Sequence, residues 1–379
     1  MIVQHFLDKS DLNSVTSVLK SGALTQGPVV QQFEEKIKTF LGVDGAVAVN
    51  SATSALHLAC VALGVSAGDI VWTSANSFAA SANCARYCGA DVDFIDIDFK
   101  TRNVSLQKLQ NKLKRASQNG KLPKCVILVH FAGSSCNMAE LASILRAYGV
   151  RIIEDASHAF GAFYKDERVG SCAYSDLSVF SFHPVKIITT GEGGVITGND
   201  PTLIERLRLL SSHGITRACA GQAIKTKQAW EYDQVALGFN FRMSDINAAL
   251  GLSQIDKADK FISKRGQIAR RYDYFLRGLD LGLPLIDPGS SWHLYVITFP
   301  STKIRDAAYQ ELVCEGFYAN VHYKPIHLMS YYRALGFKSG MFPMAEKHYK
   351  TALTLPLFPV FKKHEQVTVV DIIKSVLGR

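Results

Sequence analysis

The sequence predicts an α/β protein with a mostly parallel, seven-stranded sheet, followed by a smaller α+β domain. Seven short runs rich in β-branched residues lie between residues 46 and 198, and helical patterns separate them. This alternation ends near residue 245, so we expect a large domain at 1–245 and a small domain at 246–379. A chain of 379 residues with 47% hydrophobic content has enough apolar surface to build both cores.

The expected strands alternate with helices whose ends can be read from the sequence. A helix at 28–41 starts with proline and is followed by Gly42, which favours a stop. A second helix at 51–63 has Ser51 as its N-cap. The strands are AVAVNS, DIVWTS, DVDFIDID, PKCVILVHF, RIIEDA, SDLSVFSF and GGVITG. After residue 245 we expect one long amphipathic helix, strands in HLYVITF and NVHYK, and a C-terminal helix ending in SVLGR.

The charge of the chain favours an anionic partner, because 42 Lys and Arg stand against 33 Asp and Glu, a net charge of +9. The basic residues are scattered along the chain, so we expect a phosphorylated small molecule and no nucleic acid. No apolar run reaches the roughly 18 residues that a membrane span needs, and MIVQHFLDKSD lacks the pattern of a secretory leader. We therefore expect a cytoplasmic protein without a membrane segment.

Eight cysteines are present, and no two of them form a C-x-x-C pair. Several lie in apolar segments such as KCVILVHF. This pattern indicates reduced thiols in the core, with no disulfide framework and no metal site.

The segment SFHPVKIITTGEGG, at residues 181–194, carries the most information about function. Lys186 follows an apolar strand and precedes a glycine-rich turn, at the edge of the sheet where α/β proteins bind ligands. In RIIEDASHAFGA, Asp155 ends another strand, and His158 follows three residues later. Taken alone, a solvated loop lysine and a helix-capping aspartate are the simpler interpretations of these residues.

Taken together, these residues match the needs of pyridoxal phosphate (PLP). This cofactor needs an amine, an acid beside its ring nitrogen, and a helix N-terminus for its phosphate. Lys186 and Asp155 would supply the first two, and Thr53 and Ser54 lie at the strand-to-helix junction NSATSAL that would supply the third. Phe78, which we expect directly after a strand in TSANSFAAS, would lie against the ring, and a place in the core is its alternative.

Six segments of the chain resemble the DegT/DnrJ/EryC1/StrS sugar aminotransferases, a family of fold-type I PLP enzymes. The resemblance covers essentially the whole chain and is most specific in SFHPVK and GFNFRMSDINAALG. The other segments are LTQGP, NSATSALH, EDASHAFGA and VHYKPIH. The resemblance implies the fold-type I architecture, transamination as the activity and PLP as the cofactor.

The resemblance also implies roles for individual residues around the cofactor. Lys186 would be the Schiff-base lysine, and Asp155 would be the partner of the pyridine nitrogen. His158 would lie near the ring hydroxyl, and Phe78 would stack on the ring. The residues that would hold the phosphate are Thr53, Ser54 and Ser181.

Further residues are implied at the edges of the site. Asn240 would reach the phosphate of the neighbouring subunit's cofactor, which implies a homodimer with shared active sites. His130 departs from the family, in which aspartate often stands at this position, so its role stays open. The candidates for contact with the nucleotide or the sugar are His322, Tyr323, Lys324 and Arg242, with an edge strand of solvated charges as the alternative.

Within the family, the sequence is most similar to the transaminases of pseudaminic acid biosynthesis, which aminate C4 of a UDP-linked 4-keto-6-deoxy-N-acetylhexosamine with L-glutamate. This similarity implies that Lys186 removes the α-proton of glutamate and later returns a proton to C4 of the sugar. The UDP diphosphate would account for part of the positive charge. Another nucleotide-linked keto sugar is the alternative substrate, and the sequence does not decide the configuration at C5.

Two other functions are compatible with this scaffold. Sugar 3-dehydrases have histidine in place of the lysine and commonly an iron–sulfur cluster, so Lys186 and the lack of a cysteine cluster argue against them. A regulator that binds PLP without turnover is harder to exclude. A fused DNA-binding module would support it, but LTQGP already begins at residue 24, so we expect no such module before it.

Overall fold

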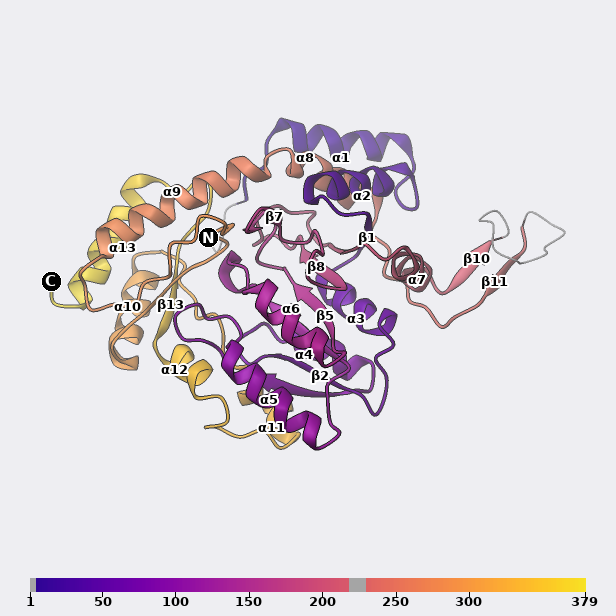
Figure 1. Ribbon diagram of the computed structural model, residues 1–379. Coiled ribbons are helices and arrows are strands. Elements are labelled where there is room, and N and C mark those ends of the chain that lie inside the picture. The colour runs from indigo at the N-terminus through magenta and orange to yellow at the C-terminus, as the bar shows by residue number, and fades with distance from the viewer. Residues whose placement is uncertain (1–4, 218–229) are drawn as a thin grey trace.

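The computed structural model describes residues 5–217 and 230–379, and a seven-stranded sheet forms its centre (Figure 1). The strand order is β1-β9-β8-β5-β4-β2-β3, in which β9 runs antiparallel to both neighbours and the other pairs are parallel. The strands are β1 (Gly45–Val49), β2 (Ile70–Ser74), β3 (Asp91–Ile95), β4 (Cys125–Val129), β5 (Arg151–Asp155), β8 (Leu177–Ser181) and β9 (Gly194–Gly198). The expected sheet is confirmed, and each of the seven expected runs supplies one strand.

Helices cover both faces of this sheet, because alternate residues of a strand point to opposite sides. In β4, Cys125 and Ile127 pack into the core on one face, whereas Val126 and Leu128 pack into the core on the other. The first face is covered by α3 (Ala52–Ala62), α4 (Ala80–Tyr87) and α7 (Pro201–Ser211), and the second by α2 (Pro28–Leu41), α5 (Leu106–Gln118) and α6 (Met138–Ala147). A sheet buried on both sides is the arrangement that parallel strands require.

The two helices expected near the N-terminus are both present. Helix α2 has the expected bounds and ends at Gly42, whose φ of +68° is a left-handed conformation that glycine adopts at little cost. Helix α3 is N-capped by Ser51 as expected. A residue distant in sequence caps the N-terminus of α2. The Asp245 carboxylate accepts the N–H of Gly27 at 2.8 Å and that of Val29 at 2.9 Å.

The C-terminal third differs from the prediction in two places. The long helix expected after residue 245 is two helices, α8 (Asp245–Ile255) and α9 (Ala258–Leu276). HLYVITF contains β12 (Tyr295–Thr298) as expected, but the strand expected in NVHYK is wrong. The partner of β12 is β13 (Ala352–Leu355), and the 320–324 segment turns toward the sheet and a cavity instead.

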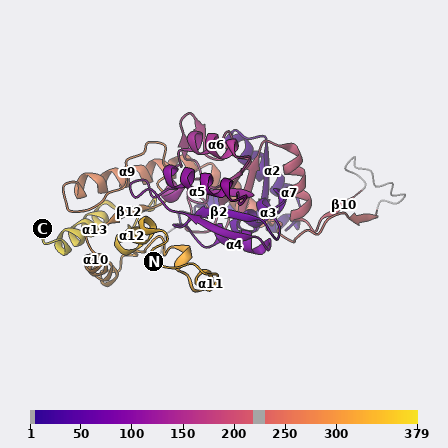
Figure 2. The same cartoon turned by 60° about the horizontal axis from the view of Figure 1, so that its bottom comes forward.

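Helix α11 (Ser330–Ala334) packs against the sheet, where Tyr332 lies against Phe94. Most of the other elements that follow α9 gather at one end of the molecule, beside the sheet and its helices (Figure 2). They include the expected C-terminal helix, α13 (Lys363–Val376). The remaining elements are α1 (Lys9–Ser21), β6 (Phe163–Tyr164), β7 (Glu167–Arg168), β10 (Ile215–Arg217), β11 (Tyr232–Gln234), α10 (Thr302–Cys314), α12 (Pro343–Thr351) and the 3₁₀ turns at Phe131–Gly133 and Ile326–Leu328. Strands β10 and β11 form a ribbon that extends away from the body (Figure 1).

The division into domains at residue 245 stays a prediction, and the packing bears on where a boundary would lie. Helix α8 packs against α1 and α2, so it shares the core of the sheet-containing part. Along α9, Phe261 belongs to that core, whereas Ile268 and Tyr272 belong to the core around β12 and β13. The change from one core to the other therefore falls within α9.

Most of the described cysteines are free and buried, as the sequence indicated. Cys314 is an exception, because it lies at the exposed end of α10, and Cys88 is half-buried. Cys219 lies outside the described residues. Within residues 5–217 and 230–379, no helix has both the length and the apolar character needed to cross a bilayer.

Candidate active site

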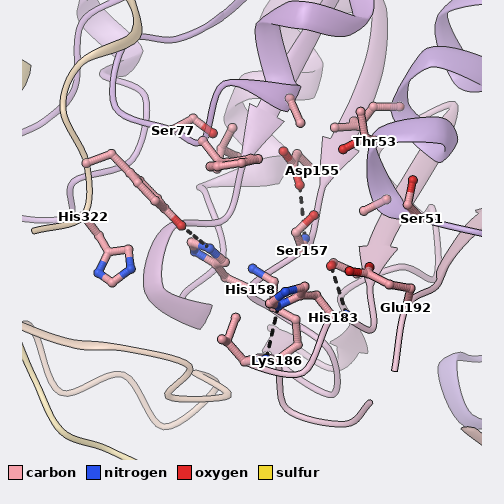
Figure 3. A pocket seen from close by; sticks show the side chains of 18 of the residues that line it. Ser51, Thr53, Ser77, Asp155, Ser157, His158, His183, Lys186, Glu192 and His322 are labelled. Atoms are coloured by element: carbon pink, nitrogen blue, oxygen red, sulfur yellow. Dashed lines mark hydrogen bonds between the residues drawn. The ribbon is translucent and has the colours of Figure 1, made fainter. Parts of the chain in front are cut away.

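A cavity of about 700 Å³ opens at the carboxyl ends of the parallel strands (Figure 3). Segments that follow β1, β2, β5 and β8 line it, and the 320–323 segment of the C-terminal third forms one side. The carboxyl edge is where open α/β sheets bind their ligands, because loops from several strands meet there. The cavity therefore combines parts of the chain that are far apart in sequence.

Lys186 lines this cavity on the loop that follows β8. Its backbone N–H donates to the carbonyl of His183 at 2.9 Å, which fixes the turn of the loop. Burial lowers the pKa of Lys186 from 10.5 to about 8, although the charge of Asp155 acts in the opposite direction. A substantial fraction of this amine is therefore neutral at slightly alkaline pH, as a nucleophile or a base must be.

Asp155 ends β5, and its carboxylate is held at both oxygens. Oδ2 accepts a hydrogen bond of 2.6 Å from the Ser81 hydroxyl, and Oδ1 accepts the N–H of Ser157 at 3.2 Å. Ser81, in the first turn of α4, is in turn bonded to Ser77, whose hydroxyl oxygen lies 2.7 Å away in the bend before the helix. These bonds keep the carboxylate in one orientation beside the cavity (Figure 3).

The N-terminus of α3 forms another wall of the cavity. Ser51, Ala52 and Thr53 line the cavity, and the N–H groups of Ala52 and Thr53 have no acceptor among the residues that the structure describes. Gly194 lies directly against this turn, since a Cβ on it would come within 2.6 Å of the Ala52 nitrogen. Free N–H groups at the positive end of a helix suit a phosphate.

His158 connects the sheet to the C-terminal third through Tyr323. Its Nδ1 accepts the backbone N–H of Ala132 at 3.3 Å, and its Nε2 lies 2.9 Å from the phenolic oxygen of Tyr323. Burial, together with the charge of Lys186, lowers the pKa of His158 well below 6.5. The neutral ring therefore carries its proton on Nε2 and donates it to Tyr323, which leaves the Tyr323 hydroxyl hydrogen free for another acceptor.

The structure brings eight of the predicted site residues together in the cavity and leaves four outside. The residues that line it are Thr53, Phe78, Asp155, His158, Ser181, Lys186, His322 and Tyr323. Ser54 lies behind the wall, where its N–H donates to the hydroxyl of Ser51 at 3.1 Å. The other three that do not line the cavity are Asn240, Arg242 and Lys324.

Two of these placements differ in detail from the expectation. Phe78 is not the first residue after a strand, because β2 ends at Ser74, and its ring is 61% exposed at the cavity mouth. Arg242 turns away from the cavity, where its Nη1 donates to the Ser212 hydroxyl at 3.0 Å.

Several residues of the site escaped the sequence analysis. Ser77 and Glu192 line the cavity, and Ser81 anchors Asp155. Ser77 lies in the bend before α4 and Ser81 in the first turn of that helix, and no local pattern in the sequence marks them as partners of Asp155. His183 lies within the quoted SFHPVK motif and also lines the cavity, although no role was assigned to it.

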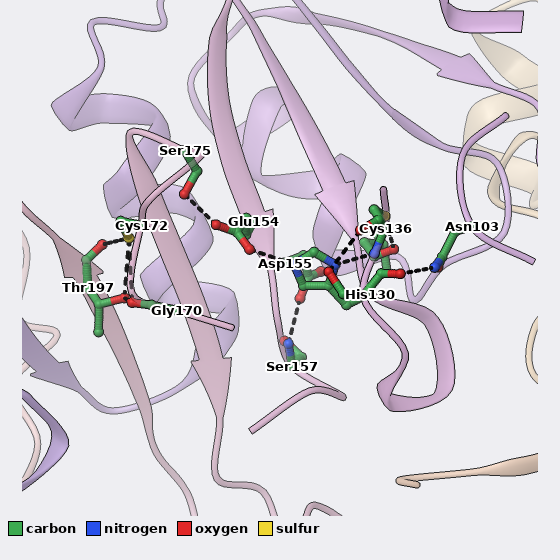
Figure 4. Close-up of polar contacts among 12 residues, drawn as sticks. Asn103, His130, Cys136, Glu154, Asp155, Ser157, Gly170, Cys172, Ser175 and Thr197 are labelled. Atoms are coloured by element: carbon green, nitrogen blue, oxygen red, sulfur yellow. Dashed lines mark hydrogen bonds and ion pairs between the residues drawn. The ribbon is translucent and has the colours of Figure 1, made fainter. Parts of the chain in front are cut away.

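His130 lies outside the cavity, on the other side of β5. It is fully buried, and its Nε2 lies 2.7 Å from a carboxylate oxygen of Glu154, while Nδ1 accepts the N–H of Cys136 at 3.1 Å (Figure 4). The second oxygen of Glu154 accepts the hydroxyl of Ser175. This network packs behind Asp155 and supports β5 from the opposite face.

The residues of this cavity fit PLP, with an amine of lowered pKa, a carboxylate held at both oxygens and a helix N-terminus with free N–H groups. Within residues 5–217 and 230–379, no group of three or more His, Cys, Asp or Glu side chains is arranged to hold a metal ion. The sheet and the cavity thus define the class of fold-type I PLP enzymes.

Within that class, the chain belongs to the DegT/DnrJ/EryC1/StrS aminotransferase family, whose model matches residues 6–374. It is 39% identical to the UDP-4-amino-4,6-dideoxy-N-acetyl-beta-L-altrosamine transaminase of Campylobacter jejuni, over 98% of this chain and 96% of that protein. The structure of Helicobacter pylori PseC, an aminotransferase involved in the biosynthesis of pseudoaminic acid, matches with a TM-score of 0.90 and 30% identity, covering 100% of this chain and 99% of that one.

Solved structures also bear on the cofactor. Spr1654 of Streptococcus pneumoniae matches at 29% identity with a TM-score of 0.92 in its PMP form, covering 100% of this chain and 99% of that one, and with 0.89 in its PLP form. The protein is therefore a sugar aminotransferase, and PLP is its cofactor.

Proposed function

We propose that the protein transfers the amino group of L-glutamate to C4 of a UDP-linked 4-keto-6-deoxy-N-acetylhexosamine in the biosynthesis of pseudaminic acid. The observation that carries this proposal is the 39% identity to the C. jejuni transaminase over 98% of the chain. The net charge of +9 agrees with a substrate that carries a diphosphate.

Several residues would hold the cofactor in this reaction. Thr53, Ser181 and the free N–H groups of α3 would hold its phosphate, Asp155 would keep its ring nitrogen protonated, and Phe78 would lie beside its ring. When bound, PLP supplies a carbonyl carbon that combines with amines and a cationic ring that takes up an electron pair. The side chains of the cavity then have to move protons and orient the substrates.

Lys186 would move the protons in both halves of the reaction. With glutamate in the cavity, the neutral amine removes the proton from the α-carbon. In the separate half-reaction with the keto sugar, Lys186 acts as the acid and delivers a proton to C4. A pKa of about 8 suits both tasks, because base and acid forms are then both populated near neutral pH.

Tyr323 would orient the sugar. Its oxygen accepts the hydrogen of His158 Nε2, so its own hydrogen can donate to a substrate oxygen inside the cavity. Burial raises the pKa of Tyr323, which keeps the phenol protonated and therefore a donor at neutral pH.

The active unit would be a homodimer with shared sites. Large apolar side chains on and beside β11 are strongly exposed in the single chain, with Trp230 at 74%, Tyr232 at 62% and Leu237 at 83%. Exposed apolar surface on a projecting ribbon is typical of a protein interface. Asn240 follows this ribbon, is exposed, and stays outside its own cavity, as a residue that serves the partner's site would be.

Mixed dimers test the shared site. Lys186→Ala and Asn240→Ala subunits, each impaired alone, should form dimers in which one site carries both lesions and the other none. Up to half of the wild-type activity per mixed dimer should then return. If subunit exchange is confirmed and nothing returns, Asn240 acts within its own chain.

The substrate proposal is tested by incubating the enzyme with L-glutamate and a panel of UDP-linked and dTDP-linked keto sugars. We expect the UDP-4-keto-6-deoxy-N-acetyl sugar to give the 4-amino product with the highest kcat/KM, with its C4 and C5 configuration read by NMR. Lys186→Ala is the control for enzyme-dependent turnover. Preference for another nucleotide sugar would overturn the assignment of the substrate while leaving the aminotransferase activity intact.

A further inference from the structure

A second cavity, of about 180 Å³, lies between the turn that precedes α5, the 3₁₀ turn after β4 and the segment before β12. Arg102, Ser134, Asp287 and Trp292 are among the residues that line it. This second cavity shares no lining residue with the active cavity, and Leu294 lies between it and a further cavity of about 170 Å³ beside Lys186.

Arg102 is a buried cation without a counter-charge. Its residue is 5% exposed, its Nε is buried without a hydrogen-bond partner, and no ion pair or side-chain hydrogen bond joins it to any residue within the described ranges. Its backbone is fixed in a tight turn, with φ at +64° and its N–H donating to the carbonyl of Asp98 at 2.8 Å. Burying an unpaired charge is strongly unfavourable, so a site of this kind is rarely left uncompensated.

Neighbouring groups do not supply the missing charge. The carboxylate of Asp287 accepts the N–H of Gly289 at 2.9 Å and forms no ion pair with Arg102 within 4.0 Å. Burial lowers the pKa of Arg102 to about 10, so the guanidinium is still charged at neutral pH. A guanidinium presents a planar set of donors that matches the oxygens of a carboxylate or a phosphate.

We propose that this second cavity is a binding site for a small oxyanion, a phosphate or a carboxylate group, with the guanidinium of Arg102 as its main contact. Ser134 contributes a second donor, because its hydroxyl has no partner in the described part of the chain. A cavity of about 180 Å³ has room for a phosphate or a carboxylate group beside the guanidinium.

The test measures thermal unfolding of the PLP-saturated enzyme, in which the phosphate site at α3 is already filled. Inorganic phosphate and acetate are titrated separately against chloride of equal ionic strength. We expect at least one of them to raise Tm saturably, by about 2–4 °C at a hundredfold excess over its Kd. The titration that gives the larger rise in Tm, with phosphate or with acetate, shows whether the site prefers a phosphate or a carboxylate group.

Three variants assign the response to the cavity. Arg102→Met should abolish it, Ser134→Ala should raise the apparent Kd several-fold, and Arg115→Met, which makes the same charge change on the exposed face of α5, should leave it unchanged. In chloride alone, Arg102→Met should unfold at the same or a higher temperature than the wild type, because it removes an uncompensated charge. If Arg102→Met does not fold, the effect of Ser134→Ala on the apparent Kd alone decides whether the anion binds in this cavity.

Two results would overturn the proposal. The first is a wild-type enzyme whose Tm does not respond to either anion beyond the chloride control. The second is a response that persists in Arg102→Met or is unaffected by Ser134→Ala, since the anion then binds elsewhere.

Discussion

Lys186 and Arg102 are both basic groups buried in cavities of this protein, and they differ in the charge that burial leaves on them near neutral pH. Burial lowers the pKa of Lys186 to about 8, whereas the pKa of Arg102 falls only to about 10. Lys186 has the Asp155 carboxylate in the same cavity, and Arg102 has no carboxylate within ion-pair distance among the described residues. The lysine can relieve its burial by losing a proton, but the arginine cannot.

This difference separates a reactive site from a binding site. An amine that is partly neutral can attack carbon and carry protons. A guanidinium that stays charged can only recruit an anion. The predictions below test this contrast, beginning with the reactive cavity.

Lys186→Ala should abolish transamination and change the visible spectrum of the bound cofactor, because it removes the only lysine that lines the active cavity in the described chain. The fold should persist, since the lysine lies on a loop beyond the end of β8. Activity with the keto sugar and the absorption spectrum with PLP measure this. Amino transfer at an appreciable fraction of the wild-type rate would show that another group moves the proton.

Asp155→Asn should lower kcat by several orders of magnitude while PLP still binds, because an amide cannot hold the ring nitrogen proton by its charge, and each tenfold is about 1.4 kcal/mol of barrier. Single-turnover kinetics measure the rate. The matched control is Glu154→Gln, the same change on the adjacent residue, whose side chain points to His130 and Ser175 behind the sheet (Figure 4). It should reduce thermal stability and leave kcat within a few-fold, and equal losses in the two variants would contradict the assignment.

The buried Lys186 should make the stability of the PLP-free protein depend on pH. Its pKa is lowered from 10.5 to about 8, so the unfolded chain binds more protons between these values, and the free energy of unfolding rises with pH across that window. Below pH 8 the buried lysine is charged, and its burial lowers the free energy of unfolding by the full amount, on the order of 3 kcal/mol. The difference in unfolding free energy between Lys186→Met and the wild type should therefore favour the variant at pH 7 and shrink toward pH 10.5.

Arg102→Met provides the comparison for that measurement, since arginine keeps its charge through pH 7 to 9. The difference in unfolding free energy between Arg102→Met and the wild type should be flat from pH 7 to 9, whereas that of Lys186→Met already changes between pH 8 and 9. A slope of the same size in both variants would refute the contrast between the two cations.

Tyr323→Phe should reduce kcat/KM for the sugar about tenfold, the cost of roughly one hydrogen bond to the substrate. The half-reaction with glutamate should change less, because that substrate does not use the phenol in our proposal. Separate half-reactions, followed by the cofactor spectrum, measure the two effects. Tyr332→Phe, which removes a buried hydroxyl bonded to Asn83 at 2.6 Å outside the cavity, should leave both half-reactions near wild type.

Local patterns explain why much of the sheet could be predicted from the sequence. Each strand is a short β-branched run, and the ends of α2 are marked by Pro28 and Gly42, which act within their own neighbourhood. Strand β13 was missed because ALTL precedes a proline and becomes a strand only by pairing with β12, whose residues lie 54 to 60 positions earlier. In NVHYK the alternation indicated a strand, but contacts of Tyr323 with His158 and Asn76 direct the segment toward the cavity.

In the candidate site, too, features set by local sequence patterns could be predicted and features set by distant contacts could not. Lys186 and Asp155 each end a recognisable motif, so the sequence could point to both. The anchoring of Asp155 by Ser81 and the pairing of His158 with Tyr323 join residues 74 and 165 positions apart, and no local pattern encodes such pairs. The burial of Arg102 without a partner among the described residues could not be predicted either, because its sequence context, TRN, is typical of an exposed turn.

The placement of the 320–326 segment has a consequence for how the chain folds. Tyr323 N–H donates to Asn76 Oδ1 at 3.2 Å, and Ile326 N–H donates to the carbonyl of Ala75 at 3.0 Å, so the wall of the active cavity closes contacts about 250 residues apart. Contacts of such high sequence separation form late, because a large loop must close before they contribute. During synthesis the strands of the sheet leave the ribosome well before this wall does. The residues proposed to hold the cofactor, from Thr53 to Lys186, therefore precede this wall in the chain, and the side of the cavity with Tyr323, which would orient the sugar, is the last to be made.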